Sequence, residues 1–239
     1  LAVALASNTS SQVGVIDADL QIGVMALFLN LMPRVTIADL VKDIDGLDQA
    51  LLEKYLTPYS DNVKVLAAPF RPEQAEAVTA ANMSAIIKTM RMMYRYVIID
   101  TTPSFSETML AALDAADIIM VVAAMDLPTL KNVKLCLEIM DSLQYSPDKV
   151  KPVLNRAGSE GGMDVREAEE SLRRPFVATI PSDGKVVVTA VNRGIPFVVS
   201  HPDTLVSQNI FNLARTIAAD DWQGTRKEGA FGKLRRLFG

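Results

Sequence analysis

Carboxylates follow apolar segments at two places in the chain. Residues 13–17 read VGVID, with Asp19 two positions on, and residues 96–100 read YVIID. A short apolar run that ends in an acid is typical of a buried strand that delivers a carboxylate to the edge of a sheet. Magnesium prefers oxygen ligands and keeps several of its waters. We therefore expect Asp100 to hold a water bound to Mg²⁺.

A simpler role for Asp100 stays open at this point. An aspartate that follows a strand often caps the next helix. Ser106 lies closer to the next helical segment and is better placed to cap it, which favours the magnesium role for Asp100.

Polar groups also follow two later apolar segments. Asn155 and Arg156 come after residues 150–154, and Pro181, Ser182 and Asp183 come after residues 176–180. Ligands of open parallel sheets bind outside the carboxyl ends of the strands. These groups and the three aspartates are therefore expected at one edge of a sheet.

The elements that must position these residues alternate between strand and helix. Several apolar segments are continuous rather than alternating, which indicates strands covered on both faces. Such a pattern predicts an α/β fold, with a doubly wound, mostly parallel sheet and helices on both faces. The expected strands are 13–17, 63–68, 96–100, 118–124, 150–155 and 176–180, and the expected helices are 37–41, 72–93, 107–116, 130–143, 164–172 and 204–218.

Composition and charge exclude several classes of protein. The 239 residues are 49% hydrophobic, which excludes a disordered chain, and no apolar run approaches the ~20 residues of a membrane span. The net charge is −4. Residues 224–239 carry five basic residues and one acidic residue, so residues 1–223 sum to −8. An acidic body argues against a broad nucleic-acid-binding face.

A phosphate-binding motif is absent from these residues. No G-x-x-x-x-G-K-[ST] occurs in the chain. Phosphoryl transfer requires positive charge around the phosphates. We therefore do not expect these 239 residues by themselves to hydrolyse ATP.

The order of the motifs resembles the MinD/ParA superfamily of deviant-Walker P-loop ATPases, and within it the CpaE/TadZ-like branch. The segments that carry the resemblance are VIDADLQIG (15–23), VLAAPFRPEQAE (65–76), YVIIDTTPSFSE (96–107), VLNRAGSEGGM (153–163) and IPSDGKVVVTAVNRGIPFV (180–198). The resemblance extends from Leu1 to about Ala218. It implies a P-loop NTPase-like fold that binds ATP and Mg²⁺ and forms a dimer with ATP.

The resemblance also assigns roles to the three aspartates. Asp17 matches the switch I aspartate that positions or activates the attacking water, and Asp19 matches a second switch I acid implicated in hydrolysis. Asp100 matches the Walker B aspartate near Mg²⁺.

The later polar residues match the part of the family site that recognises the base. Asn155 and Arg156 match the base-recognition pair, and Pro181 and Asp183 match residues that flank the adenine. An asparagine amide offers both a donor and an acceptor, which suits the edge of adenine.

The resemblance places residues 1–6, LAVALA, in the helix that follows the phosphate-binding loop. Residues 1–223 are then expected to be an ATPase domain that lacks its first strand and its P-loop, and the gene product is expected to extend upstream. The missing strand is expected to be central in the sheet, with a neighbour on each side.

Residues 224–239 form a second unit, a basic amphipathic tail. On a helix, Phe231, Leu234, Leu237 and Phe238 form one apolar stripe, and Lys233, Arg235 and Arg236 lie off it. This pattern is typical of helices that lie in a membrane interface, and it resembles the membrane-targeting segment of MinD. The simpler possibility is that the tail packs on its own domain.

Three functions remain open from the sequence. The first is an ATP-dependent, dimerising ATPase switch at the cytoplasmic face of the cell membrane, which positions pilus, secretion or division machinery through an unknown protein cargo or activator. The second is a non-catalytic scaffold without a phosphate loop. The third is a ParA-type DNA-partitioning ATPase, which the acidic body disfavours.

Overall fold

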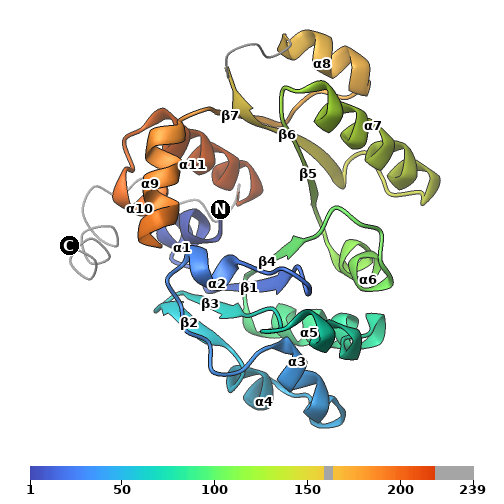
Figure 1. Ribbon diagram of the computed structural model, residues 1–239, viewed down its shortest axis with the longest axis vertical. Helices are drawn as coiled ribbons and strands as arrows, with labels where there is room; N and C mark the ends of the chain where they lie inside the picture. The colour runs from blue at the N-terminus through green and yellow to red at the C-terminus, as the bar shows by residue number, and fades with distance from the viewer. Residues whose placement is uncertain (159–163, 219–239) are drawn as a thin grey trace.

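A computed structural model describes residues 1–158 and 164–218 of the chain (Figure 1). The chain begins with helix α1 (Ala2–Thr9) and then enters strand β1 (Val13–Ala18). From there helices and strands alternate to the last described helix, α11 (Leu205–Ile217). No helix in the described ranges is long and apolar enough to cross a membrane.

The first sheet holds four strands in the order β2-β3-β1-β4. Strand β1 lies between β3 (Val63–Leu66) and β4 (Tyr96–Thr101) and is parallel to both. Strand β2 (Thr57–Ser60) pairs antiparallel with β3 at the edge. The continuous burial of residues 13–17 in β1 agrees with a strand covered on both faces.

The second sheet holds three parallel strands in the order β5-β6-β7. These are β5 (Ile119–Ala123), β6 (Val150–Ala157) and β7 (Ala178–Pro181). Helices α7 (Leu127–Ser142) and α8 (Val165–Leu172) connect them in sequence. The α/β class with mostly parallel strands is therefore confirmed.

The strands form two sheets, which are separated between β4 and β5. No ladder joins β4 to β5, although only α6 (Glu107–Ala115) separates them along the chain. Among the described strands, each of these two therefore has a sheet partner on one side only. The two sheets lie in the lower and upper parts of Figure 1.

Helices cover both faces of the first sheet. On one face, α1 and α11 pack against apolar side chains of β1 and β3, including Val13, Val15 and Val65. On the other face, β1 and β3 pack against α3 (Ile37–Leu40), α4 (Gln49–Glu53) and α5 (Ala80–Met93). Gly14 allows α5 to pack closely, because a Cβ there would lie 2.5 Å from Cε of Met90.

The second sheet is covered in the same way, and two helices link the sheets. Helices α7 and α8 cover one face of it, and α11 covers the other. Helix α11 places Phe211 in the core of the first sheet and Leu213 in the core of the second. Helix α6 likewise contributes Ala112 to one core and Leu113 to the other.

Several elements differ from the sequence prediction. The helix expected over 72–93 is divided into a 3₁₀ turn η2 (Pro72–Ala77) and α5, because Val78 is extended and Thr79 caps α5 by accepting a hydrogen bond from the N–H of Asn82 at 3.2 Å. The segment after Ile37 continues as a second 3₁₀ turn, η1 (Val41–Gly46). The sequence reasoning assigned no element to β2, α2 (Met25–Phe28), α4, α9 (Gly184–Arg193) or α10 (Phe197–Ser200).

Candidate functional site

Asp17 and Asp100 are neighbours at the carboxyl ends of adjacent strands. The parallel register of β1 and β4 pairs Asp17 directly with Asp100. Neighbouring strands lie ~4.8 Å apart, and paired residues of parallel strands share a face of the sheet. The two carboxylates predicted from the sequence are therefore brought together.

Asp17 is buried, and only one of its two carboxylate oxygens has a hydrogen-bond partner among the described residues. The side chain is 2% exposed, and its Oδ2 accepts a hydrogen bond from the N–H of Met25 at 3.2 Å. Its Oδ1 is buried and has no hydrogen-bond partner among the described residues. A buried carboxylate oxygen without a donor is costly, so this atom marks the place where a positive or donating group fits.

The loop after β1 closes over Asp17 because residue 23 is glycine. A Cβ on Gly23 would lie 2.3 Å from the Cβ of Ala68 and 2.7 Å from Oδ2 of Asp17. Both distances are too short for any side chain. The glycine therefore permits the close approach that brings the N–H of Met25 to the carboxylate.

Burial and like charge make this pair of acids hard to ionise. Burial raises the pKa of Asp17 to about 6, and the charges of Asp100 and Asp19 add to the effect. Partial burial also raises the pKa of Asp100, and Asp19 raises it further. A cation beside both carboxylates would reverse these shifts.

Asp19 shapes the loop beside this pair. Its Oδ1 accepts a hydrogen bond from the N–H of Ile22 at 3.1 Å, which holds a tight turn. One of its oxygens thus has a structural role, and its charge acts on both Asp17 and Asp100.

Asn155 and Arg156 lie at an irregularity in β6. The register with β7 shifts between Leu154 and Ala157, so β6 has one extra residue there, as in a β-bulge. Arg156 has a φ of 56°, and its N–H donates to Oδ1 of Asn155 at 3.0 Å. The bulge leaves both side chains exposed at the carboxyl end of the strand.

Pro181 and Asp183 follow at the end of β7. Pro181 pairs with Ala157, and the N–H of Ser182 donates to the carbonyl of Ala157 at 2.8 Å. Asp183 caps α9, since its Oδ1 accepts from the N–H of Val186 at 3.0 Å. The sequence predicts that Asp183 flanks the adenine, and the structure shows that it also caps α9.

The predicted site residues thus form two groups on different sheets. Asp17, Asp19 and Asp100 lie at the end of the first sheet, and Asn155, Arg156, Pro181 and Asp183 lie at the end of the second. The break between β4 and β5 separates the groups. The predicted tail residues, Phe231, Lys233, Leu234, Arg235, Arg236, Leu237 and Phe238, lie outside the described residues.

Two residues at these edges were not singled out from the sequence. The first is Gly23, which its position in the loop, six residues after Asp17, could have indicated. Asp126 is the other. It follows β5 and caps α7 through the N–H of Thr129 at 2.8 Å. The hydrogen bonds from Thr129 lower the pKa of Asp126, and the charge of Arg156 lowers it further.

The carboxylates at this edge offer a small set of ligands for a magnesium ion. No three histidine, cysteine or acidic side chains in the described parts of the chain converge on a metal position. Magnesium bound with nucleotides uses one or two carboxylates, water and phosphate oxygens. The adjacent pair Asp17 and Asp100, with an unpartnered oxygen on Asp17, fits that more limited requirement.

Comparisons with known proteins identify relatives by sequence and by fold. No protein-family model matches the sequence. The septum site-determining protein MinD of Thermotoga maritima is 26% identical over 221 residues, covering 90% of this chain and 79% of that protein. An uncharacterized ATP-binding protein of Methanocaldococcus jannaschii is 24% identical over 245 residues, covering 100% of this chain and 89% of that protein. This chain is homologous to the MinD/ParA ATPases.

Solved structures show the same fold. A ParA family ATPase from Chlorobium tepidum superposes with a TM-score of 0.84 at 22% identity, over 89% of each chain. MinD from Pyrococcus horikoshii, complexed with Mg-ADP, superposes with a TM-score of 0.77 at 22% identity, over 90% of this chain and 86% of that one. The two-sheet arrangement therefore retains the overall fold of MinD/ParA proteins.

Proposed function

We propose that this protein is a MinD/ParA-type switch that binds ATP with Mg²⁺, dimerises, attaches to the cytoplasmic face of the membrane and positions cellular machinery. The observation that carries the proposal is the in-register pair Asp17 and Asp100, with a buried, unpartnered oxygen on Asp17. The ATP-binding relatives and the MinD relatives support the nucleotide. The CpaE/TadZ-like resemblance favours pilus or secretion machinery, and the MinD relatives favour a division site.

In this proposal the aspartates act at the phosphates, and the later polar residues act at the base. Asp100 would hold a water on the magnesium ion, and Asp17, with Asp19 beside it, would orient the attacking water. When bound, magnesium supplies positive charge to the phosphate oxygens. Asn155 has its amide nitrogen available for a base, since only its Oδ1 is used by Arg156. Pro181 and Asp183 lie on the neighbouring strand end and would flank the base.

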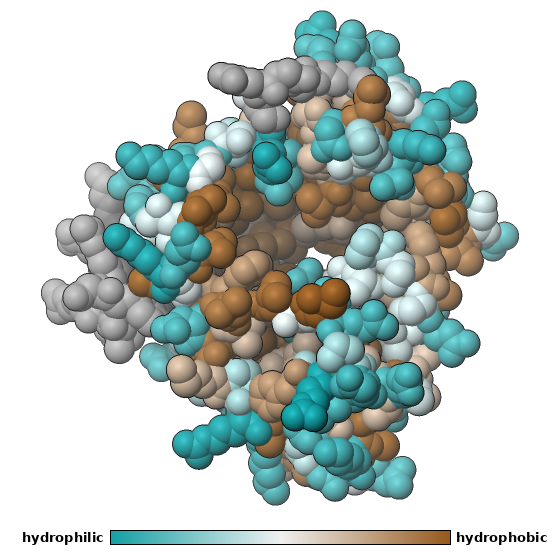
Figure 2. Space-filling view, in the orientation of Figure 1, coloured by the Kyte–Doolittle hydropathy of each residue, from teal (hydrophilic) through white to brown (hydrophobic). Residues whose placement is uncertain are grey.

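We also propose that the complete ATPase domain has one more strand, between β4 and β5, followed by a phosphate-binding loop that leads into α1. Both strands lack a partner on their facing sides within the described residues. Val122 of β5 is 58% exposed although its neighbours in the strand are buried. Figure 2 shows a hollow at the centre of the molecule with hydrophobic residues around it.

The surroundings of Leu1 support that position for the added segment. Leu1 packs against the cores of both sheets. The first turn of α1 also lacks a side-chain cap, so its N–H groups are free to bind phosphate.

Membrane attachment is assigned to residues 224–239, whose basic and apolar residues suit an anionic surface. One such tail binds weakly, and a dimer that presents two binds more tightly through avidity. ATP-dependent dimerisation would therefore control attachment.

The test is sedimentation of the complete gene product with vesicles that contain anionic lipid, in ATP, ADP or no nucleotide. We expect ATP-dependent sedimentation that is lost in Asp100→Asn and in a deletion of residues 229–239. The exposed Asp148→Asn serves as a matched control and should sediment like the parent. ATP binding without any vesicle binding would overturn the membrane role alone.

The scaffold remains the second candidate because G-x-x-x-x-G-K-[ST] is absent from these 239 residues. Vesicle binding that is equal with and without nucleotide, together with no measurable ATP binding, would establish the scaffold and overturn the switch. Salt-sensitive binding to non-specific DNA would instead favour the DNA-partitioning alternative.

A further inference from the structure

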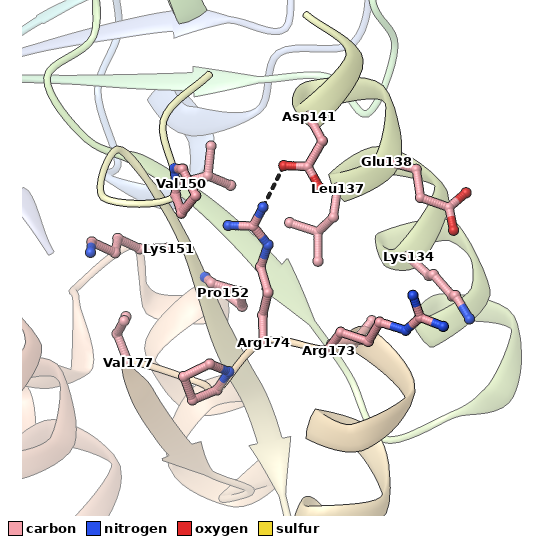
Figure 3. Close-up of a pocket in the computed structure, with 13 residues that line it drawn as sticks. Lys134, Leu137, Glu138, Asp141, Val150, Lys151, Pro152, Arg173, Arg174 and Val177 are labelled. Atoms are coloured by element: carbon pink, nitrogen blue, oxygen red, sulfur yellow. Dashed lines mark hydrogen bonds and ion pairs between the residues drawn. The ribbon is translucent and has the colours of Figure 1, made fainter. Parts of the chain in front are cut away.

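A pocket of about 620 Å³ lies at the amino-terminal edge of the second sheet. It is bounded by the last turns of α7, the start of β6, and the linker that joins α8 to β7 (Figure 3). Asn155 and Pro181 lie at the other ends of these same strands. The pocket is therefore separate from the nucleotide site proposed above and does not rest on that proposal.

Prolines and fixed contacts give the pocket a rigid wall. Pro152 lies in the middle strand β6, where it accepts a hydrogen bond from Val177 but has no N–H to offer the linker. The pairing of β6 with β7 begins only at Ala178, so the sheet is open at this edge. The linker is held by an ion pair between Arg174 and Asp141 and by a hydrogen bond from the N–H of Phe176 to Glu169 at 2.8 Å.

The pocket carries excess positive charge. Four basic and two acidic residues line it, in a chain whose net charge is −4. Arg174 is paired with Asp141, and Lys151 lies 4.0 Å from Asp148. Lys134 and Arg173 have no ion pair in the described part of the chain, and their side chains point toward one another in Figure 3.

Arg173 has a strained backbone conformation at the end of α8. Its φ is 53°, in the left-handed region that side chains other than glycine rarely adopt. Residue 173 ends α8, where glycine is the usual choice. Arg173 and Lys134 line the same pocket without an ion pair among the described residues, so an anion bound there would be attracted by both.

Apolar surface accompanies the two cations. Leu137, Leu172 and Val150 form the base of the pocket and are buried. Val177 is 41% exposed at the rim, beside the exposed Pro147 and Pro175. A free inorganic anion gains nothing from such surface, whereas a peptide with an apolar side chain next to an acidic one uses both.

We propose that this pocket binds an acidic peptide segment of a partner protein, with a carboxylate between Lys134 and Arg173 and an apolar side chain against Val177. The preformed wall reduces the ordering cost of binding. The complementary charges raise the association rate and select against basic segments.

The experiment measures fluorescence anisotropy of a labelled peptide of alternating leucine and glutamate with the full chain, without nucleotide. We expect saturable binding that weakens with salt. Lys134→Ala and Arg173→Ala should each weaken it about two- to fivefold, the range for exposed ion pairs. Lys131→Ala, on the same helix but outside the pocket, is the matched control and should bind like the parent.

Two further peptides and a charge exchange separate the possible outcomes. Peptides with glutamine for glutamate, or alanine for leucine, should bind more weakly. The doubly exchanged variant, Lys134→Glu with Arg173→Glu, should instead bind a peptide of alternating leucine and lysine.

Three results would overturn the proposal. One is no saturable binding of the acidic peptide to a folded parent. Another is equal binding of the alanine peptide together with displacement by inorganic phosphate, which would make this a site for simple anions. The third is a loss of thermal stability in Arg173→Ala with unchanged peptide affinity, which would limit Arg173 to its role at the end of α8.

Discussion

The buried carboxylate of Asp17 leads to a quantitative prediction about stability. Its pKa is about 6 in the folded chain, against an ordinary value of 3.8. Because the folded chain holds this proton more tightly, the contribution of Asp17 to stability falls as the pH rises from about 4 to about 6 and is level above that range. The shift corresponds to about 3 kcal/mol lost from the free energy of unfolding at pH 7.

The substitution Asp17→Asn removes this pH dependence. The amide does not ionise, and its oxygen can still accept from the N–H of Met25. Its NH₂ group has no acceptor if it occupies the position of the unpartnered Oδ1, which costs about 1–3 kcal/mol. At pH 7 the unfolding free energy of the variant is therefore expected to equal or exceed that of the parent. At pH 4 the difference between variant and parent should have shifted by about 3 kcal/mol in favour of the parent.

The assay is urea unfolding of parent and variant at intervals from pH 4 to pH 8. The quantity to follow is the difference in unfolding free energy between them, because other titrating groups cancel in that difference. Asp148→Asn, at a fully exposed side chain, is the control substitution. A flat difference between Asp17→Asn and the parent would refute the burial argument.

Three other substitutions test separate parts of the fold. Gly23→Ala should lower the unfolding free energy by about 1–3 kcal/mol in urea, since its Cβ has no room beside Asp17; an unchanged midpoint would show that the loop moves freely. Arg174→Ala should cost about 1 kcal/mol, as expected for an ion pair with the half-exposed Asp141, and this loss should shrink in high salt. Leu5→Ala should cost about 2–5 kcal/mol by calorimetry, because Leu5 is fully buried, and a loss under 1 kcal/mol would contradict the packing of α1.

The sequence by itself determined the strands and the groups that follow them. Continuous apolar runs specify strands covered on both faces, and β1, β3, β4, β5 and β6 lie where such runs occur. The position of Asp17 and Asp100 at the strand ends followed from the same runs. Ser106 caps α6 as expected, accepting from the N–H of Met109 at 3.2 Å, so the cap signal was also local.

Some elements were not found from the sequence. Residues 184–193 contain GKVVVTAVNR, a β-branched run that favours a strand, yet they form α9. The helix is delimited by a cap at each end: Asp183 accepts from the N–H of Val186 at 3.0 Å, and Gly194 ends the helix with a φ of 62°. Strand β2 is short and contains Pro58, and it exists because it pairs with β3.

Only the tertiary structure decided how the site residues are combined. The register of β1 with β4 joins Asp17 to Asp100, and the glycine at residue 23 closes the loop that buries Asp17 and leaves one oxygen without a partner. The separation of the two sheets depends on which strands pair with each other. The same pairing sets the distance between the acidic group and Asn155. Hydrogen bonds between distant segments set these features, and no local pattern of residues encodes them.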